Sequence, residues 1–318
     1  MIKKFLGLFS LLLILVLAYG LNQLRLAHAD IDSLAPGLPT LKAVRESGLV
    51  FGLPTGIGYY NTATQRVPRT SVLDQAQDPV TDEGVMVDMS FPAFVVTWED
   101  GRQFVIDAGF SAAEAVEFGR RSELAGSEPL IFHDLVANHL ETGKVKGIGF
   151  THLHTDHTMG ASALCKTQAD FSIVQTIEQY SWHNYLTSTS AELLNNLGCG
   201  LQLILDDGLI LKSVGNFPGL YVVHVAGHTL GSQLYIVNVN QGSNIGTYIL
   251  AGDMANHMDG IKYNISKPPA YSRWLVPENL EQLNKVRVWL KTMDQEPDIT
   301  VLISHDKADL MESALPPL

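Results

Sequence analysis

Residues 151–160, with the sequence THLHTDHTMG, limit most narrowly the structures that this chain can adopt. The segment holds three of the 11 histidines of the 318-residue chain, together with an aspartate. In an extended loop the i, i+2 spacing places His152 and His154 on one side, whereas a helix would point them in different directions. The short apolar segment 144–150 just before it predicts a buried strand. We therefore expect a compact fold that presents this loop at the end of a strand.

Metal ligation gives the cluster a physical reason. Buried protonated imidazoles and carboxylates would repel or desolvate one another, whereas neutral imidazoles and ionised carboxylates are ligands that zinc binds. His152, His154, Asp156 and His157 are therefore predicted to be metal ligands. The alternative is a solvated polar loop.

Three further segments place a lone polar residue directly after an apolar strand: His228 in YVVHVAGH, Asp253 in TYILAGD and His305 in TVLISH. Loops at the strand ends of a rigid scaffold carry a large share of functional residues. Five histidines and two aspartates are too many for one tetrahedral zinc, but they suit two sites that each keep an open or water position. With no cysteine among these ligands, zinc is favoured, and iron or manganese is the alternative.

The rest of the chain predicts a mixed α and β fold in three parts. We expect residues 1–29 to form a signal peptide or membrane anchor, residues 30–83 to form an irregular lead-in, and residues 84–318 to form the main domain. In the main domain, strands are predicted at 85–98, 103–110, 144–150, 171–174, 209–214, 221–226, 232–239, 247–252 and 298–306. Helices are predicted at 111–122, 130–140, 161–167, 176–197 and 277–293.

The first 29 residues have the three-part pattern of a secretory signal. Lys3 and Lys4 precede the uncharged apolar run 5–21, and Ala27-His28-Ala29 follows as a cleavage site of the A-x-A type. Export to the periplasm or the medium is therefore predicted. An uncleaved anchor through residues 5–21 and a buried helix of the fold are the alternatives.

Composition narrows the partners of the mature protein. The formal net charge of −12 disfavours nucleic acid, because such binding depends on lysine and arginine that neutralise phosphates. A small-molecule substrate is expected, and a membrane only through the N-terminal segment. Cys165 and Cys199 could form one disulfide in an oxidising compartment or remain as two buried thiols.

The whole set of polar residues resembles the ligand pattern of the metallo-β-lactamase superfamily. The resemblance runs over residues 85–306 and includes AGHTLGS, AGD and Asp107 in VIDAG, where that superfamily commonly has a structural aspartate. It implies an αβ/βα four-layer sandwich of the α/β class and two divalent metal ions, with zinc favoured. It also implies the ligand roles: His152, His154 and His228 on the first ion, Asp156, His157 and His305 on the second, and Asp253 bridging both.

Two such ions predict a hydrolase in which metal-bound hydroxide attacks a carbonyl, with Asp156 as a catalytic proton shuttle to the leaving group. The acyl-homoserine lactonase-like group is most similar, so a lactone or other ester is predicted. Those lactonases typically have a tyrosine three residues after the bridging aspartate; this chain has Asn256 there, and Tyr263 is the expected substitute. β-Lactam, thioester or phosphodiester hydrolysis, iron-dependent oxidoreduction, and a non-catalytic binding module are the alternatives.

Overall fold

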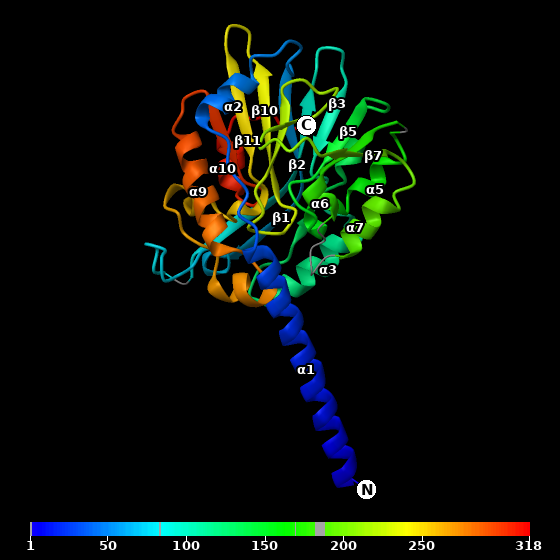
Figure 1. Ribbon diagram of the computed structural model, residues 1–318, viewed down its shortest axis with the longest axis vertical. Coiled ribbons are helices and arrows are strands. Elements are labelled where there is room, and N and C mark those ends of the chain that lie inside the picture. Colours follow the sequence, from blue (N-terminus) through cyan, green and yellow to red (C-terminus); the bar gives the residue numbers. More distant parts are fainter. Residues whose placement is uncertain (1, 83, 169, 182–187) are drawn as a thin grey trace.

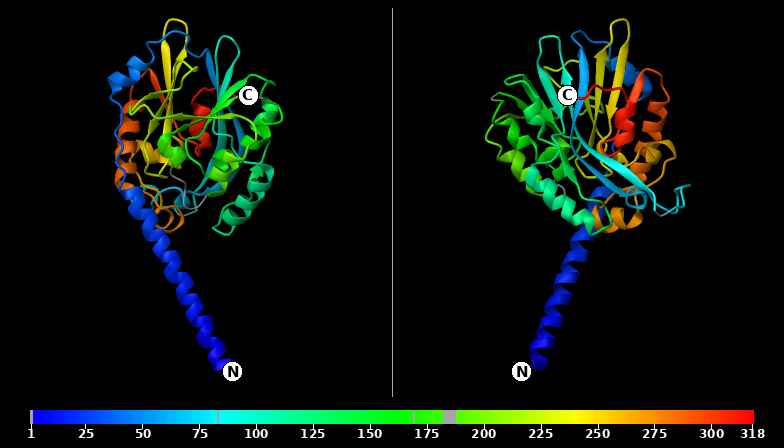
Figure 2. Two further views of the ribbon diagram at one scale, coloured as in Figure 1. Left: turned by 45° about the vertical axis from the view of Figure 1, so that its right-hand side comes forward. Right: turned by 180° about the vertical axis from the view of Figure 1, so that it is seen from behind.

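Two β-sheets that pack face to face form the centre of the molecule. The computed structural model describes residues 2–82, 84–168, 170–181 and 188–318. Across these residues, helices cover the outer face of each sheet, with α9 outside one sheet and α3, α5 and α7 outside the other (Figures 1 and 2). The predicted αβ/βα four-layer sandwich is confirmed.

The strands fall into a larger and a smaller sheet. The larger sheet has the order β4 (Ile131–Phe132), β1 (Gly56–Pro68), β2 (Met86–Thr97), β3 (Gln103–Ile106), β5 (Val145–Gly149), β6 (Ser172–Thr176) and β7 (Leu201–Leu205). The smaller sheet has the order β12 (Ile299–Leu302), β11 (Ile245–Leu250), β10 (Gln233–Asn240), β9 (Leu220–His224) and β8 (Lys212–Ser213). The pairs β3–β5, β5–β6, β6–β7 and β11–β12 are parallel, so their carboxyl ends lie at common sheet edges.

The helices are mostly short. They are α1 (Ile2–Asp32), α2 (Leu41–Ser47), α3 (Ala112–Glu123), α4 (Thr155–Thr158), α5 (Ala161–Leu164), α6 (Ile177–Ser181), α7 (Ser188–Asn195), α8 (Met258–Lys262), α9 (Leu280–Asp294) and α10 (Lys307–Glu312). Single 3₁₀ turns form η1 (Arg69–Ser71), η2 (Val136–His139) and η3 (Gly252–Met254), and a π-helical turn forms η4 (Tyr271–Leu275).

Three apolar layers hold the sandwich together. Side chains such as Phe94, Phe104 and Tyr235 fill the space between the two sheets, and all three are buried. Leu283 and Leu290 of α9 pack on the outer face of the smaller sheet, while the helices of the larger sheet cover its outer face. Burial of this apolar surface fixes the two sheets relative to each other, and with them the loops at their edges.

The clearest sequence patterns gave the correct elements. β2 and β3 form the predicted antiparallel hairpin around the EDGR turn. Ser111 caps α3 by accepting a hydrogen bond from the backbone N–H of Glu114, as a serine at this position favours. The helix α9 begins after Asn279, which caps it in the same way, and its first residue, Leu280, is exposed.

The helix predicted at 130–140 is wrong. Ile131 pairs with Thr64 of β1 as part of the short strand β4, and only the 3₁₀ turn η2 follows. The Asp134 side chain accepts hydrogen bonds from the backbone N–H of Leu135 and from the side chain of Asn138. Such local bonds compete with a helix and favour a turn.

The lead-in is also more regular than expected. Within residues 30–83, β1 pairs along nearly its whole length with β2 and so belongs to the larger sheet. A register shift between Asn61 and Thr64 interrupts the alternation of buried and exposed residues, which hides the strand in the sequence. The last predicted strand, 298–306, is shorter, because Asp306 caps the additional helix α10.

A disulfide joins the chain before β6 to the chain before β7. Cys165, which follows α5, forms a disulfide with Cys199, just before β7. The predicted helix at 176–197 is present as α6 and α7, and residues 182–187 between them lie outside the described residues. β7 extends the larger sheet where no strand was predicted, and the strand predicted at 209–214 is reduced to β8.

Candidate metal centre

Loops at the ends of five strands meet at one edge of the sandwich. Asp107 follows β3, the cluster from His152 to His157 follows β5, and His228, Asp253 and His305 follow β9, β11 and β12. Gly252, with φ of +54°, turns the chain so that Asp253 faces the cluster. A Cβ at this glycine would clash with the side chain of Thr151, so a larger residue does not fit there.

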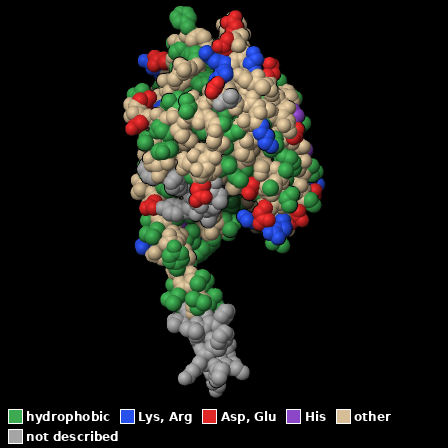
Figure 3. All heavy atoms as spheres, turned by 90° about the vertical axis from the view of Figure 1, so that its right-hand side faces the viewer, with side chains coloured by type: hydrophobic (Ala, Val, Ile, Leu, Met, Phe, Trp, Pro, Cys, Tyr) green, Lys and Arg blue, Asp and Glu red, His purple; other side chains and the backbone are tan. Residues whose placement is uncertain are grey.

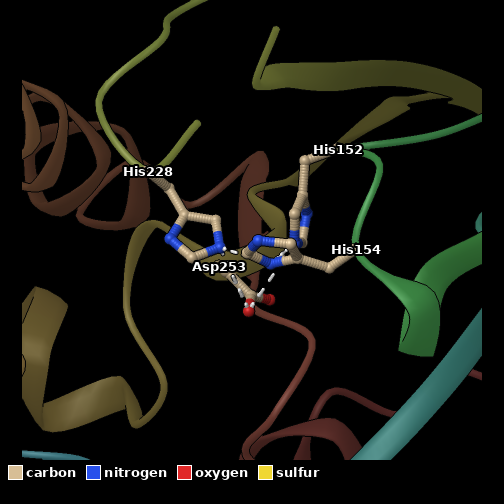
Figure 4. A group of neighbouring side chains, drawn as sticks. All are labelled: His152, His154, His228 and Asp253. Atoms are coloured by element: carbon tan, nitrogen blue, oxygen red, sulfur yellow. Dashed lines mark hydrogen bonds and ion pairs between the residues drawn. The ribbon is translucent and has the colours of Figure 1, made fainter. Parts of the chain in front are cut away.

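One group of potential ligand atoms comprises His152, His154, His228 and Asp253 (Figure 4). The Nδ1 atom of His154 lies 2.9 Å from His152 Nε2 and 3.1 Å from His228 Nε2. Asp253 Oδ2 lies 3.8 Å and 3.7 Å from the same two Nε2 atoms. Three imidazoles and a carboxylate that converge in this way form a donor set suitable for a divalent transition metal.

A second group comprises Asp156, His157, Asp253 and His305. His305 Nε2 lies 3.1 Å from Asp253 Oδ2 and 3.3 Å from Asp156 Oδ2. The structure thus brings together all seven residues singled out in the sequence, and Asp253 is common to both groups. Their role as ligands remains a prediction.

Two buried atoms of these groups test whether a metal would fit. Among the residues that the structure describes, neither His157 Nε2 nor Asp253 Oδ1 makes a hydrogen bond, although the two lie 3.3 Å apart. Buried polar atoms that make no hydrogen bond are rare and call for an explanation. A cation between these atoms would satisfy both, so the donor sets fit two divalent ions that share Asp253.

Hydrogen bonds behind the second group fix its histidines. Asp107, which is fully buried, accepts hydrogen bonds from His157 Nδ1 (2.8 Å) and from the backbone N–H and hydroxyl of Thr151 (2.8 and 2.9 Å). The carbonyl oxygen of Ser90 accepts a hydrogen bond from His305 Nδ1 at 2.9 Å. In each histidine the other nitrogen, Nε2, is thereby left as the potential ligand atom.

A buried charge network, absent from the sequence-based prediction, lies behind His228. Glu278 Oε1 accepts hydrogen bonds from His228 Nδ1 at 2.6 Å and from Lys267 Nζ at 2.8 Å. Its other oxygen accepts one from the hydroxyl of Ser272 at 2.5 Å. Burial would raise the pKa of Glu278, but the charge of Lys267 and the bond from His228 lower it to about 2. Glu278 is therefore an anion that orients His228.

A tyrosine from η4 also faces the centre. Tyr271 is hydrogen-bonded to the side chain of Asn256, and the charges of Glu278, Asp253 and Asp156 act on it. Burial, together with these charges, raises the pKa of Tyr271 well above its usual value, so its hydroxyl remains a neutral donor. Tyr263, the residue expected from the sequence, is 64% exposed and does not occupy this position.

The imidazoles of the first group are held neutral. Burial and the neighbouring His228 lower the pKa of His154 to about 3. Burial, with the nearby His157, lowers the pKa of His152 well below its usual value, and burial with the charge of Lys267 also lowers that of His228. Neutral imidazole is the form that binds metal, so this group is ready to bind at neutral pH.

In the second group the pKa values of the histidines are raised instead of lowered. Burial would lower the pKa of His157 and His305, but the surrounding carboxylates outweigh it: Asp107 raises the first well above its usual value, and Asp253 raises the second to about 9. Burial would raise the pKa of Asp156, yet the charge of His157 and the bond from His305 lower it to about 2. In protein stripped of metal, this group is therefore a set of ion pairs.

We expect the two groups to differ in proton release when stripped protein binds a divalent ion at pH 7. The first group should release almost none, and the second about two protons, from His157 and His305, because these must become neutral to bind. Affinity at the second group should rise with pH, and the contribution of His305 to this rise should end near its pKa of about 9, because each histidine must lose a proton to bind. Isothermal titration calorimetry in buffers of different ionisation enthalpy measures the number of protons that are released on binding. In His305→Gln the release should fall by about one proton; equal release at both groups would contradict the prediction.

Comparisons with known proteins agree with this geometry. Residues 92–238 match the family described as the metallo-beta-lactamase superfamily. No curated protein matches the chain.

Several solved structures share the fold. One is an N-acyl homoserine lactone hydrolase with the product N-hexanoyl-L-homoserine at its catalytic metal centre; it is 15% identical, with a TM-score of 0.61, over 84% of this chain and 98% of that one. Another is a probable metal-dependent hydrolase from Staphylococcus aureus, with 13% sequence identity and a TM-score of 0.53, over 81% of this chain and 91% of that one. A third is AidC, a dizinc quorum-quenching lactonase, with 13% sequence identity and a TM-score of 0.51, over 80% of this chain and 90% of that one. At these identities the likeness shows the fold alone.

Proposed function

Because residues 92–238 match the metallo-β-lactamase superfamily, we propose that this chain is a dinuclear metal-dependent hydrolase that opens a lactone or a related ester. The observation that carries the proposal is the sharing of Asp253 by two buried groups of potential ligands. A closed structural site would need only one such group. The similar structures include lactone hydrolases, which supports the choice of substrate class.

The metal-holding residues follow from the two groups. His152, His154 and His228 would hold one ion, Asp156, His157 and His305 the other, and Asp253 would contact both. Zinc suits a set of histidine and carboxylate ligands without cysteine. Divalent ions in such a pair supply Lewis acidity and activate water at neutral pH.

The remaining roles belong to the protein's own side chains. Asn256 is hydrogen-bonded to Tyr271, and the neutral hydroxyl of Tyr271 can donate to the carbonyl oxygen of a substrate. Asp156, ionised because its pKa is about 2, can accept a proton and pass it towards the leaving oxygen. Glu278 and Asp107 keep His228 and His157 in the required orientation.

Export is part of the same proposal. The Cys165–Cys199 disulfide is typical of oxidising compartments such as the periplasm or the extracellular medium. The apolar helix α1 has the length and composition of a signal or an anchor. Both features support a protein that acts outside the cytoplasm on a small molecule.

A substrate panel tests the proposed reaction. The purified full chain is assayed with a lactone, an aryl ester, a thioester, a β-lactam and a phosphodiester, before and after treatment with a chelator, with elemental analysis of each sample. We expect lactone or ester turnover that is lost with the metal and restored by zinc. Turnover confined to β-lactam or phosphodiester would replace the proposed substrate class, and iron with redox activity would replace hydrolysis itself.

A further inference from the structure

The helix α1 projects from one end of the domain as a single stalk (Figures 1 and 2). Its large apolar side chains between residues 12 and 21 are each at least half exposed, and Figure 3 shows apolar side chains on the stalk near the domain. Exposed apolar surface of this extent is costly in water. The apolar stretch is long enough to enter or cross the hydrocarbon core of a bilayer.

The end of α1 nearest the domain is built into the fold. Ala27 and Ile31 are only 2% exposed. His28 Nε2 donates a hydrogen bond to the carbonyl oxygen of Arg273 at 3.0 Å, and the Asn279 side chain donates one to the carbonyl oxygen of Ile31 at 3.2 Å. Cleavage after Ala29 would remove the contacts of Ala27 and His28. The packing therefore favours an intact helix over a removed signal.

The π-helical turn η4 lies against this end of α1 and links it to the metal centre. On its inner side, Tyr271 is hydrogen-bonded to Asn256 and Ser272 to Glu278. On its outer side, Trp274 is 57% exposed and Leu275 61% exposed. Within this one turn, Tyr271 and Ser272 are therefore directed towards the metal centre, whereas Trp274 and Leu275 present apolar surface near the base of the stalk.

The composition of this outer surface fits the boundary between lipid and water. Tryptophan and arginine are enriched where a protein meets the headgroups, because each has an apolar body and a polar end. Arg273, Trp274 and Leu275 are consecutive and exposed, and Arg25 on the stalk is exposed beside the same end of the domain. This short patch lies at the base of the stalk, where His28 contacts Arg273.

We propose that the domain rests on a lipid bilayer, with α1 retained as its anchor and Trp274 and Leu275 seated in the lipid interface. The partner is the bilayer itself, and the contact does not depend on the reaction proposed above. Because η4 also carries Tyr271, the metal centre lies on the membrane side of the domain.

Depth measurements on the full chain in lipid nanodiscs test the contact. The only cysteines form the disulfide, so Leu275→Cys can be labelled selectively with a nitroxide. The matched control is Phe51→Cys, another exposed apolar residue a few positions after α2. Figure 1 shows α2 near the end of the domain that lies away from α1. We expect the ratio of collisions with oxygen to collisions with a water-soluble nickel chelate to be several-fold higher at residue 275. Equal ratios would overturn the proposal.

Tryptophan quenching gives a second measurement that needs no introduced cysteine. Lipids brominated near the headgroup should quench part of the fluorescence of the wild type. That part should vanish in Trp274→Phe and persist in Trp289→Phe, a partly buried tryptophan whose Nε1 donates to the carbonyl oxygen of Pro39. Quenching that is unchanged in Trp274→Phe would count against the contact.

The intact mass of the protein purified from bacterial membranes tests retention of the anchor. We expect the N-terminal helix to be present and the protein to resist carbonate extraction. A chain that begins at Asp30 would overturn the proposal. None of these three measurements requires turnover, so a failure of the proposed hydrolase function would leave their outcome readable.

Discussion

Asp253→Ala should lower kcat/KM at least about 1,000-fold for every substrate that the wild type hydrolyses. Asp253 is the carboxylate shared by both groups of potential ligands, so its loss removes a donor from each. A metal pair that polarises a carbonyl is worth several kcal/mol in the transition state, and each 1.4 kcal/mol changes the rate about tenfold. Elemental analysis of the same sample should show a fall from two bound ions to one or fewer.

The control for this substitution is Asp100→Ala, in the exposed turn between β2 and β3. It removes a carboxylate of the same size far from the centre and should leave both rate and metal content unchanged. Asp253→Asn separates charge from shape, because the amide fills the same space without the negative charge. Full activity in Asp253→Ala would show that the seven residues do not act as one dinuclear centre.

The sequence could group these seven residues because each lies in a loop after an apolar strand, and a strand is recognisable over only a few residues. Asp253 after β11 and His305 after β12 lie side by side because the two strands are parallel neighbours. Strand ends at one sheet edge are therefore close in space even when some 50 residues separate them along the chain. Polar residues that directly follow apolar strands can therefore be grouped in space from the sequence alone.

The supporting residues could not be found in this way. Glu278 lies in the segment PENLEQ, where the sequence indicates only the start of a helix, and Lys267 lies in a loop without periodicity. Their role depends on the position of that loop over His228, which tertiary packing decides. Tyr271 was missed for the same reason, since η4 has no repeating apolar pattern.

Local chemistry also misled the prediction where tertiary pairing competes with it. Ile131 and Phe132 have side chains that suit either a helix or a strand, and the edge of β1 decides between them. Gly160 has a role that the sequence does not reveal: its backbone is in the right-handed helical region, and a Cβ there would clash with the carbonyl oxygen of Ala108. A glycine at this position allows a close approach of two backbones.

Glu278→Gln should weaken metal binding by the first group about 10- to 100-fold, as expected when the partner that orients a ligating histidine is lost. The amide keeps the size of the carboxylate but not its charge, so His228 loses its anionic acceptor. The second group, which has no contact with Glu278 among the described residues, should keep its affinity. Competition with a chromogenic chelator measures the two affinities separately.

The same substitution should also lower the free energy of unfolding of the stripped protein by about 3–5 kcal/mol, because it leaves the buried charge of Lys267 unpaired. The double variant Lys267→Met/Glu278→Gln removes that charge, since Met has an apolar side chain of similar length. We expect it to regain most of the lost stability, as buried ion pairs replaced by apolar residues often do. It should not regain metal affinity, because His228 still lacks an anionic partner.

Recovery of stability without recovery of metal affinity would show that Glu278 positions His228 and does not serve only to stabilise the fold. If Glu278 served only to neutralise Lys267, stability and metal affinity would recover together in the double variant. The surface pair Lys285–Glu281, with side chains 53% and 81% exposed, provides the matched control. Glu281→Gln should change neither quantity measurably, because solvent screens exposed ion pairs and the bond between Lys285 and Glu281 is an exposed one. The effects of Glu278→Gln and Glu281→Gln on stability and metal affinity can then be compared. The difference between them gives the contribution of an ion pair that is buried next to His228 relative to an exposed one.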